Sequence, residues 1–138
     1  MSESYVDTDV IIRLLTGDDP AKQAAAKALF EEVEQGRLTL VAPDTVIADA
    51  VYVLSSPRLY SLSRAQVSAL LTPLVRLTHF EVQNKTAVSQ ALALYETTNL
   101  DFGDLLIVAS MRHAHADTLY SYDKDFDRIP GVIRREPA

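Results

Sequence analysis

Apolar and polar residues alternate along the chain in a way that predicts helices separated by short strands. Apolar positions recur at helical spacing in the longer segments, while brief apolar runs bounded by turn residues are typical of strands. Helices are expected at residues 10–17, 21–35, 44–56, 64–77, 85–98 and 100–111. Strands are expected at residues 4–9, 37–43, 80–83 and 118–123, with one further edge strand in the C-terminal loop.

This order of elements predicts the fold class. Strands that alternate with helices are joined by right-handed crossovers, which gives a mostly parallel central sheet flanked by helices. The expected fold is therefore α/β, a three-layer sandwich. Pro73 lies inside a helical pattern, so we expect a kink or a break there. With 138 residues, 48% of them hydrophobic, we expect residues 1–138 to form a single domain around one core.

Composition narrows the setting in which the protein works. The chain has no cysteine, which excludes a disulfide framework and a thiolate metal site and fits a reducing cytosol. Its N-terminus has no basic region followed by an apolar core, and no apolar run reaches about 18 residues. We therefore expect a soluble, cytoplasmic protein that does not associate with a membrane.

The net charge of -6 argues against a nucleic-acid binder, because polyanions are attracted to basic surfaces. A cluster of acids that binds divalent cations removes this objection, since the bound metal reverses the local field. The position of the acids along the chain therefore matters more than their number.

Some acidic residues follow predicted strands. Asp7 comes after the first strand and Asp123 after the last, and Asp9 lies in the same turn as Asp7. In an open parallel sheet, functional groups gather beyond the carboxyl ends of the strands. Each of these residues also suits an ordinary turn. The residues alone leave both interpretations open.

Two other acids lie on predicted helices with apolar faces. Asp104 shares a face with Ile107 and Val108, and Asp49 lies at the edge of the apolar face of its helix. A buried, unpaired carboxylate is costly, which favours a cation, a hydrogen-bond network or a raised pKa at such positions. The alternatives are a capping box formed by Asp101 and Asp104, and a solvated charge at Asp49.

Four acidic segments in this order resemble the PIN domain family, above all the VapC toxins of type II toxin–antitoxin modules. The segments are YVDTDVIIRLLTGDDP, VIADAVYVLS, LDFGDLLIVAS and LYSYDKDFDRIPGV, and together they span nearly the whole chain. The resemblance implies a single PIN-like nuclease domain. The chain departs from the family at Asp9, where asparagine is common, and at Asp49, where glutamate is usual. The second departure shortens one acidic arm of the expected site by one methylene.

The resemblance implies a metal-dependent endoribonuclease that hydrolyses RNA phosphodiester bonds with the 3′ hydroxyl as leaving group. Its catalytic residues would be Asp7, Asp49, Asp104 and Asp123, and Asp7, Asp104 and Asp123 would bind the metal. Carboxylate oxygens without histidine or cysteine favour Mg²⁺ or Mn²⁺. Asp101 would then cap its helix.

Four further residues are candidates for a supporting role. Asp9 is a possible additional ligand or acceptor, Ser121 could orient an acid or a water, and Arg13 and Lys124 are candidates for phosphate contact. The resemblance also implies a homodimer, and a small antitoxin protein that neutralises it.

Other functions remain open at this stage. A degenerate PIN domain would bind RNA or protein without cleavage, and the segment DTDVI also resembles the first motif of aspartate-based phosphohydrolases. A phospho-receiver domain would gather acids at strand ends but has no use for Asp104. The letters Asp101-Phe102-Gly103 match a kinase motif, but the chain lacks the other kinase motifs and about half the required length.

Overall fold

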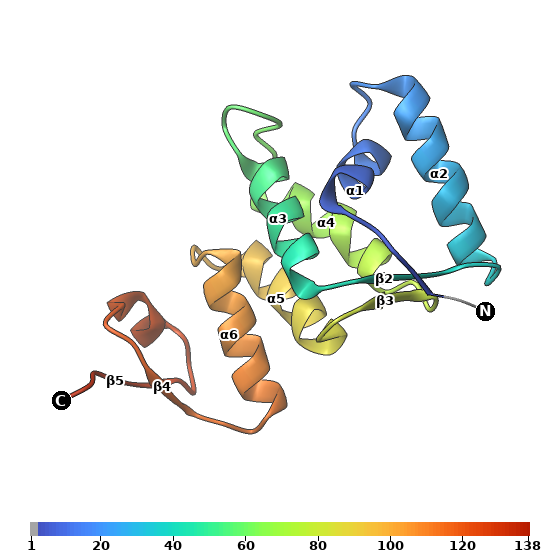
Figure 1. The fold of residues 1–138 in the computed structure, drawn as a ribbon. Helices are drawn as coiled ribbons and strands as arrows, with labels where there is room; N and C mark the ends of the chain where they lie inside the picture. The colour runs from blue at the N-terminus through green and yellow to red at the C-terminus, as the bar shows by residue number, and fades with distance from the viewer. Residues whose placement is uncertain (1–2) are drawn as a thin grey trace.

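The structure is a computed structural model and describes residues 3–138. Three short parallel strands form its central sheet, which Figure 1 shows among the helices. β1 (Glu3–Tyr5) and β3 (Phe80–Val82) pair on either side of β2 (Thr39–Ala42), in the order β1-β2-β3. The carboxyl ends of the three strands therefore meet at one edge of the sheet.

Helices connect the strands, as the sequence pattern predicted. Asp19 caps the second helix through the amide of Lys22 (3.1 Å), and Ser63 and Gln66 form a capping box at the fourth. The helices are α1 (Thr8–Leu15), α2 (Pro20–Glu34), α3 (Asp44–Ser55), α4 (Arg64–Val75), α5 (Lys85–Thr97) and α6 (Phe102–His113). The expected break at Pro73 is absent, since α4 continues through it to Val75.

The core lies where the sheet meets these helices. Phe30 of α2 and Phe80 of β3 meet edge to face, with ring centroids 5.5 Å apart. Leu71 of α4 and Leu92 of α5 are fully buried. Ser68 is the buried polar residue found among residues 3–138, and its hydroxyl donates to the Leu92 carbonyl at 3.0 Å, so it joins α4 to α5 without an unpaired group.

Arg64, the first residue of α4, joins that helix to the segment that precedes α6. Its guanidinium stacks over the Tyr95 ring at 3.7 Å from the centroid, and its Nε donates to the Tyr95 carbonyl at 2.7 Å. A second guanidinium nitrogen donates to the Leu100 carbonyl. The start of α6 is thus held against the core.

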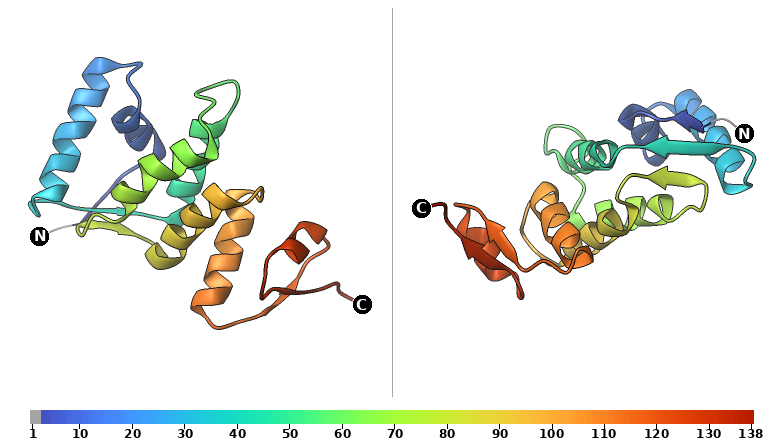
Figure 2. Two further views of the ribbon diagram at one scale, coloured as in Figure 1. Left: turned by 180° about the vertical axis from the view of Figure 1, so that it is seen from behind. Right: turned by 60° about the horizontal axis from the view of Figure 1, so that its bottom comes forward.

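The C-terminal unit, residues 118–135, forms a separate two-stranded parallel sheet. It consists of β4 (Thr118–Tyr120), the short 3₁₀ helix η1 (Lys124–Arg128) and β5 (Ile133–Arg135). The views in Figures 1 and 2 agree that this unit lies beyond α6, away from the central sheet. Phe126 of η1 and Ile129 just after it are buried in the core, and Leu119 of β4 and Val132 pack against it partly buried.

The predicted fold class, α/β with parallel strands and flanking helices, is confirmed. The last two strands depart from the prediction, because they pair with each other instead of extending the central sheet. Among the described residues, no helix is long and apolar enough to span a bilayer.

Candidate active site

Asp7 lies directly after β1 and begins α1. Its Oδ1 accepts a hydrogen bond from the Thr8 amide at 2.7 Å, so the carboxylate caps the helix. The Thr8 hydroxyl donates to the Val46 carbonyl at 3.2 Å, which joins the start of α1 to α3. Asp7 and Asp49 line one pocket of about 570 Å³, called here the Asp7–Asp49 pocket. Two of the four predicted acids therefore lie together.

Aromatic and apolar side chains form the other wall of the Asp7–Asp49 pocket. Tyr52, one helical turn beyond Asp49 on α3, lines it with 72% of its surface exposed. Leu59, in the loop after α3, lines it with 59% exposed. The pocket thus combines carboxylates with an exposed ring on which a planar group could stack.

A polar network fixes Arg13 at the border of this pocket. Arg13 donates to Oδ1 of Asp18 at 3.2 Å, and the Tyr60 hydroxyl donates to Oδ2 of the same carboxylate at 2.7 Å. Hydrogen bonds from Tyr60 and then from Thr16, with the nearby Arg13 charge, hold the pKa of Asp18 below its usual value. Arg13 is thereby directed by a carboxylate that remains charged at neutral pH.

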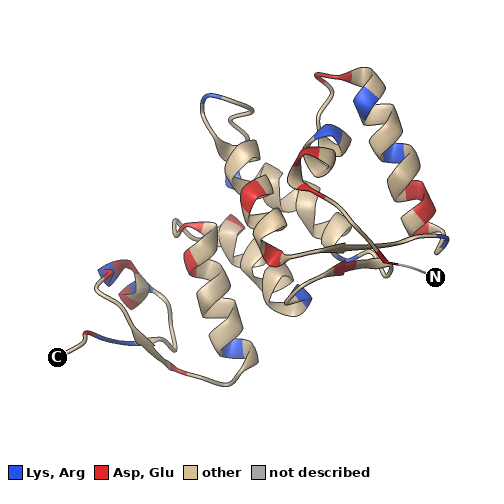
Figure 3. Cartoon of the chain, viewed as in Figure 1, with Lys and Arg blue, Asp and Glu red and all other residues tan. Residues whose placement is uncertain are grey.

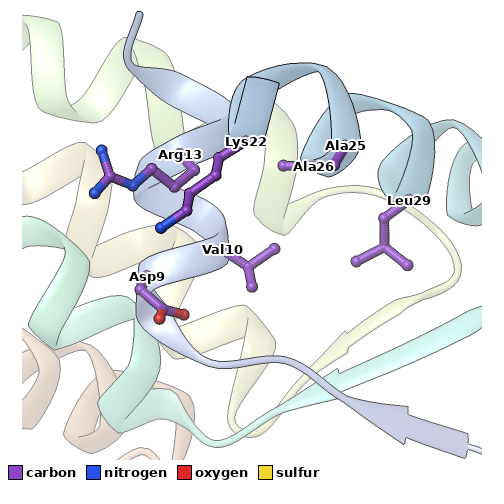
Figure 4. A pocket seen from close by; sticks show the side chains of 7 residues that line it. All are labelled: Asp9, Val10, Arg13, Lys22, Ala25, Ala26 and Leu29. Atoms are coloured by element: carbon purple, nitrogen blue, oxygen red, sulfur yellow. The ribbon is translucent and has the colours of Figure 1, made fainter. Parts of the chain in front are cut away.

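A second pocket of about 490 Å³ continues from the first along α1 and α2 (Figure 4). Asp9 and Arg13 line both pockets, so the two form a continuous surface. Lys22 reaches from α2 toward α1 above a floor of Val10, Leu29 and alanine side chains. Two cations therefore lie along one path that leads away from Asp7 and Asp49.

Asp104 lies in the first turn of α6 and is partly buried. Burial raises the pKa of its carboxyl group above the usual value, and the charges of Asp101, Asp123 and Asp125 raise it further. Asp101 occupies the N-cap position, but its side chain makes no capping hydrogen bond. The capping box considered from the sequence is therefore not formed, and Asp104 belongs to a group of like charges, called here the Asp104–Asp123 cluster.

Asp123 follows β4 and begins η1. Its Oδ1 accepts from the Asp125 amide at 2.9 Å, and its own amide donates to the Ser121 hydroxyl at 3.0 Å. The Ser121 hydroxyl thus fixes the turn that carries Asp123 by binding the Asp123 backbone amide and not its carboxylate. Lys124, the next residue, is exposed at the first position of η1.

The predicted acids therefore form two groups in one copy of the chain. Within residues 3–138, no three carboxylate or imidazole side chains lie close enough together to hold one metal ion. Figure 3 shows acidic positions on α1 and α3, and separately at the start of α6 and on η1. Carboxylate oxygens suit Mg²⁺ or Mn²⁺ by their chemistry. In this conformation, however, Asp7, Asp104 and Asp123 are too far apart to bind one such ion together.

Sequence reasoning did not identify several residues of these pockets. Tyr52, Tyr60 and Lys22 line them or direct their charges. Tyr52 had a usable signal, because it lies three residues after Asp49 and so faces the same way on a helix. Tyr60 had none, since its contact with Asp18 joins residues 42 positions apart.

Comparisons with known proteins give one family. The model of the PIN domain family matches residues 4–132. Among solved structures, the chain is similar to one titled "Crystal structure of VapBC2 from Rickettsia felis bound to a DNA fragment from their promoter", with 17% identity, 98% of each chain covered and a TM-score of 0.39. A similarity at that TM-score supports no further conclusion. No curated protein matches the sequence.

Proposed function

Because the chain belongs to the PIN domain family, we propose that it is a metal-dependent endoribonuclease, and the toxin of a toxin–antitoxin pair. The observation that carries the proposal is the family match over nearly the whole chain together with the Asp7–Asp49 pocket, in which two motif acids lie beside Arg13. PIN domains are in general metal-dependent nucleases. The endoribonuclease activity, the toxin role and the residue roles below are our proposal.

The surroundings of the Asp7–Asp49 pocket suit a ribonucleotide chain. Arg13 and Lys22 offer cations to successive phosphates along the path from the acids. The exposed Tyr52 ring offers a stacking surface for a base, an interaction that does not depend on base identity. These features support RNA as the substrate and leave the overall charge of -6 compatible with it.

The proposed metal ligands are Asp7, Asp104 and Asp123, and the proposed ion is Mg²⁺ or Mn²⁺. Such an ion supplies a water of lowered pKa and neutralises charge on the phosphate that is attacked. One copy of the chain does not gather these three side chains. We therefore assign to the single chain only the binding and orientation of RNA by Arg13 and Lys22 beside Asp7.

Cleavage of a structured RNA, measured with and without metal, tests the nuclease proposal. We expect cleavage with Mg²⁺ or Mn²⁺, none in EDTA, and a loss of about 100-fold or more on Asp7→Asn. Asp44→Asn, on the same helix as Asp49 but outside the pocket, is the matched control and should cleave normally. Undiminished cleavage in EDTA and by Asp7→Asn would exclude the mechanism.

The short acidic arm at Asp49 provides a second test. Glutamate is one methylene longer and is the residue usual in the family, so Asp49→Glu should preserve or raise cleavage. A misplacement of about 1 Å can cost on the order of 100-fold in rate. If Asp49→Glu folds normally but loses activity, the shorter arm is an adaptation of this protein.

The toxin role is tested in bacteria. Over-expression should arrest growth in several hosts, and co-expression of a small antitoxin, encoded by a short reading frame immediately upstream, should relieve the arrest. Harmless over-expression in every host would remove the toxin role and leave the nuclease proposal standing.

A non-catalytic PIN domain that binds RNA or protein is the second candidate. The observation that favours it is the division of the acids into two groups within residues 3–138. A calorimetric titration with Mn²⁺ separates the two candidates, because the nuclease should bind the ion and the non-catalytic domain should not. The non-catalytic domain should also bind RNA equally with and without metal.

A further inference from the structure

Within residues 3–138, β1 and β4 each have an unpaired edge and an exposed surface, as does β5 beside β4. In the described part of the chain, β1 pairs only with β2, and β4 pairs only with β5. All three residues of β1 are exposed, whereas Phe80 and Val82 of β3 are buried and the Phe80 carbonyl accepts from Lys85. An exposed edge presents unpaired amide and carbonyl groups that readily pair with another strand.

Exposed tyrosines flank both of these edges. Tyr5 on β1 is 71% exposed, Tyr120 on β4 is 65% exposed, and Tyr122 just after β4 is 69% exposed. In one copy of the chain these rings are not packed into the core. Large aromatic rings gathered on strand edges are typical of a surface that another element covers.

The chain itself keeps β4 away from its own β1. Two backbone hydrogen bonds end α6: the His115 amide donates to the Arg112 carbonyl (3.2 Å), and the Ala116 amide donates to the Met111 carbonyl (2.8 Å). A guanidinium nitrogen of Arg112 donates to the Pro130 carbonyl at 3.3 Å, which fixes the C-terminal unit to the same helix.

The C-terminal unit is also attached through the core. Phe126 and Ile129 are 3% and 5% exposed and belong to the same buried cluster as the residues of α6. Residues 114–117 are the whole connection between α6 and β4, and four extended residues span at most about 14 Å. Folding β4 back onto its own β1 would break these contacts, whereas pairing with another copy would not.

We propose that two copies of this chain associate reciprocally, with β4 of each copy pairing in parallel with β1 of the other, so that Asp7 of one copy and Asp123 of its partner complete one site. Each half of the dimer then contains a continuous five-stranded sheet, and the arrangement closes after two copies because the two contacts are identical. Parallel pairing places the carboxyl ends of β1 and β4 at one edge, which brings together the acids that follow them. The assembly needs only the strand edges, while its catalytic consequence rests on the proposed nuclease function.

Disulfide cross-linking tests the assembly without any activity measurement, because the chain contains no cysteine. If Asp7 lies opposite Asp123, then Ser4 lies opposite Tyr120, since each is three residues earlier. The double variant Ser4→Cys/Tyr120→Cys should oxidise to a covalent dimer on a denaturing gel, and neither single variant should. A disulfide within one chain overturns the proposal, and so do free thiols in a protein of monomeric mass.

Mixing two inactive variants tests the shared site whatever the strand register. Asp7→Asn and Asp123→Asn should each be inactive alone. In a mixed dimer, one of the two sites combines Asp7 of the Asp123→Asn chain with Asp123 of the Asp7→Asn chain and is intact. The other site carries both substitutions, and half of the dimers are mixed. Random exchange should therefore restore about a quarter of wild-type cleavage.

The two tests separate failure of the assembly from failure of the proposed function. If wild type cleaves RNA and the mixture stays inactive, each site lies within one chain and the proposal is overturned. This result also decides the case in which the cysteine variant is a dimer but forms no disulfide. If the covalent dimer forms but wild type cleaves no RNA under any metal condition, the nuclease function fails and the assembly remains.

Discussion

The central sheet and the C-terminal unit are both built from parallel strands, but they are stabilised differently. In β2, Leu40 and Ala42 are 2% and 0% exposed, because helices cover the sheet. In β4 and β5 no residue is buried, and the buried side chains that join the unit to the core are Phe126 and Ile129. An isolated two-stranded sheet is marginally stable in water. The C-terminal unit therefore gains most from a further partner.

The same division separates the candidate catalytic residues. The Asp7–Asp49 pocket belongs to the well-packed part of the chain, and Asp123 belongs to the exposed part. A site shared between a rigid region and a region that still has free edges can form only when both are in place. Substitutions on either side therefore have different and measurable effects.

The largest expected effect is the loss of cleavage from either side of this division. Asp123→Asn should reduce RNA cleavage by about 100-fold or more, as Asp7→Asn should, since each removes a proposed metal ligand. Asp127→Asn, on the same short helix but paired with Arg134, is the control and should retain activity. Full activity of Asp123→Asn would restrict the site to the Asp7–Asp49 pocket and show that the C-terminal unit contributes no catalytic residue.

A smaller effect distinguishes the stability of the two regions. Leu92→Ala removes a fully buried side chain of the main core and should lower the free energy of unfolding of the whole chain by about 2–5 kcal/mol. Phe126→Ala should instead loosen the C-terminal unit first, because Phe126 is one of the two buried residues that join this unit to the core. Amide hydrogen exchange reports this directly, with faster exchange at residues 118–135 and unchanged exchange in β2. Equal acceleration in β2 would show that the two regions unfold together.

A change of a few degrees is expected at Asp104. Its raised pKa means that the folded state favours the protonated form, so this contribution to stability is present at low pH and is lost as the pH rises through the folded-state pKa. Asp104→Asn should therefore raise the melting temperature of the EDTA-treated protein near neutral pH and flatten its decline above about pH 4. The variant should also lose the stabilisation that Mn²⁺ gives wild type. A less stable variant with an unchanged Mn²⁺ response would mean that Asp104 only supports the helix start.

The smallest effect concerns the network that directs Arg13. Tyr60→Phe removes the strongest cause of the lowered Asp18 pKa, so that pKa should move back up toward its usual value. A lowered pKa stabilises the folded state above the unfolded-state pKa, and this stabilisation is lost as the pH falls through the lower value. The variant should lose less stability on acidification than wild type. An NMR titration of Asp18 checks the shift, and an unchanged Asp18 would assign the lowering to Thr16 and Arg13.

The local pattern of the sequence was sufficient for most of the fold. Periodicity and capping residues located helices α1 to α6, and β2 and β3 fell close to their predicted positions. β1 ends at Tyr5, four residues before the expected end at Asp9, because α1 begins at Thr8. The absence of a break at Pro73 has a physical reason, because Pro73 lies in the last turn of α4, where buried Leu74 and Val75 hold the backbone in place. Local pattern cannot specify which strand pairs with which, since register and neighbours depend on contacts far apart in the chain. The separate β4–β5 sheet was therefore not predictable.

The candidate site was predictable only as a set of residues. The positions of Asp7 and Asp49 relative to strand and helix indicated that they could meet, and they share a pocket. The convergence of Asp104 and Asp123 with that pocket was an inference from a continuous sheet, and it stays a prediction. Tyr60, Asp18 and Arg13 meet through the loop after α3, whose path has no signature in the sequence.

The contacts of Arg64 have a consequence for the order of events during folding. Its two carbonyl partners, Tyr95 and Leu100, are 31 and 36 residues away, so these bonds can form only after a long loop has closed. The helices around them form from local contacts and need no such closure. We therefore expect the attachment of α6 to be a late step, made after the folding transition state. Arg64→Lys, which cannot reproduce the planar stacking and the paired donors, should then accelerate unfolding and leave the refolding rate nearly unchanged in a denaturant-dependence experiment. A slower refolding rate would instead place α6, and Asp104 with it, among the first parts of the molecule to assemble.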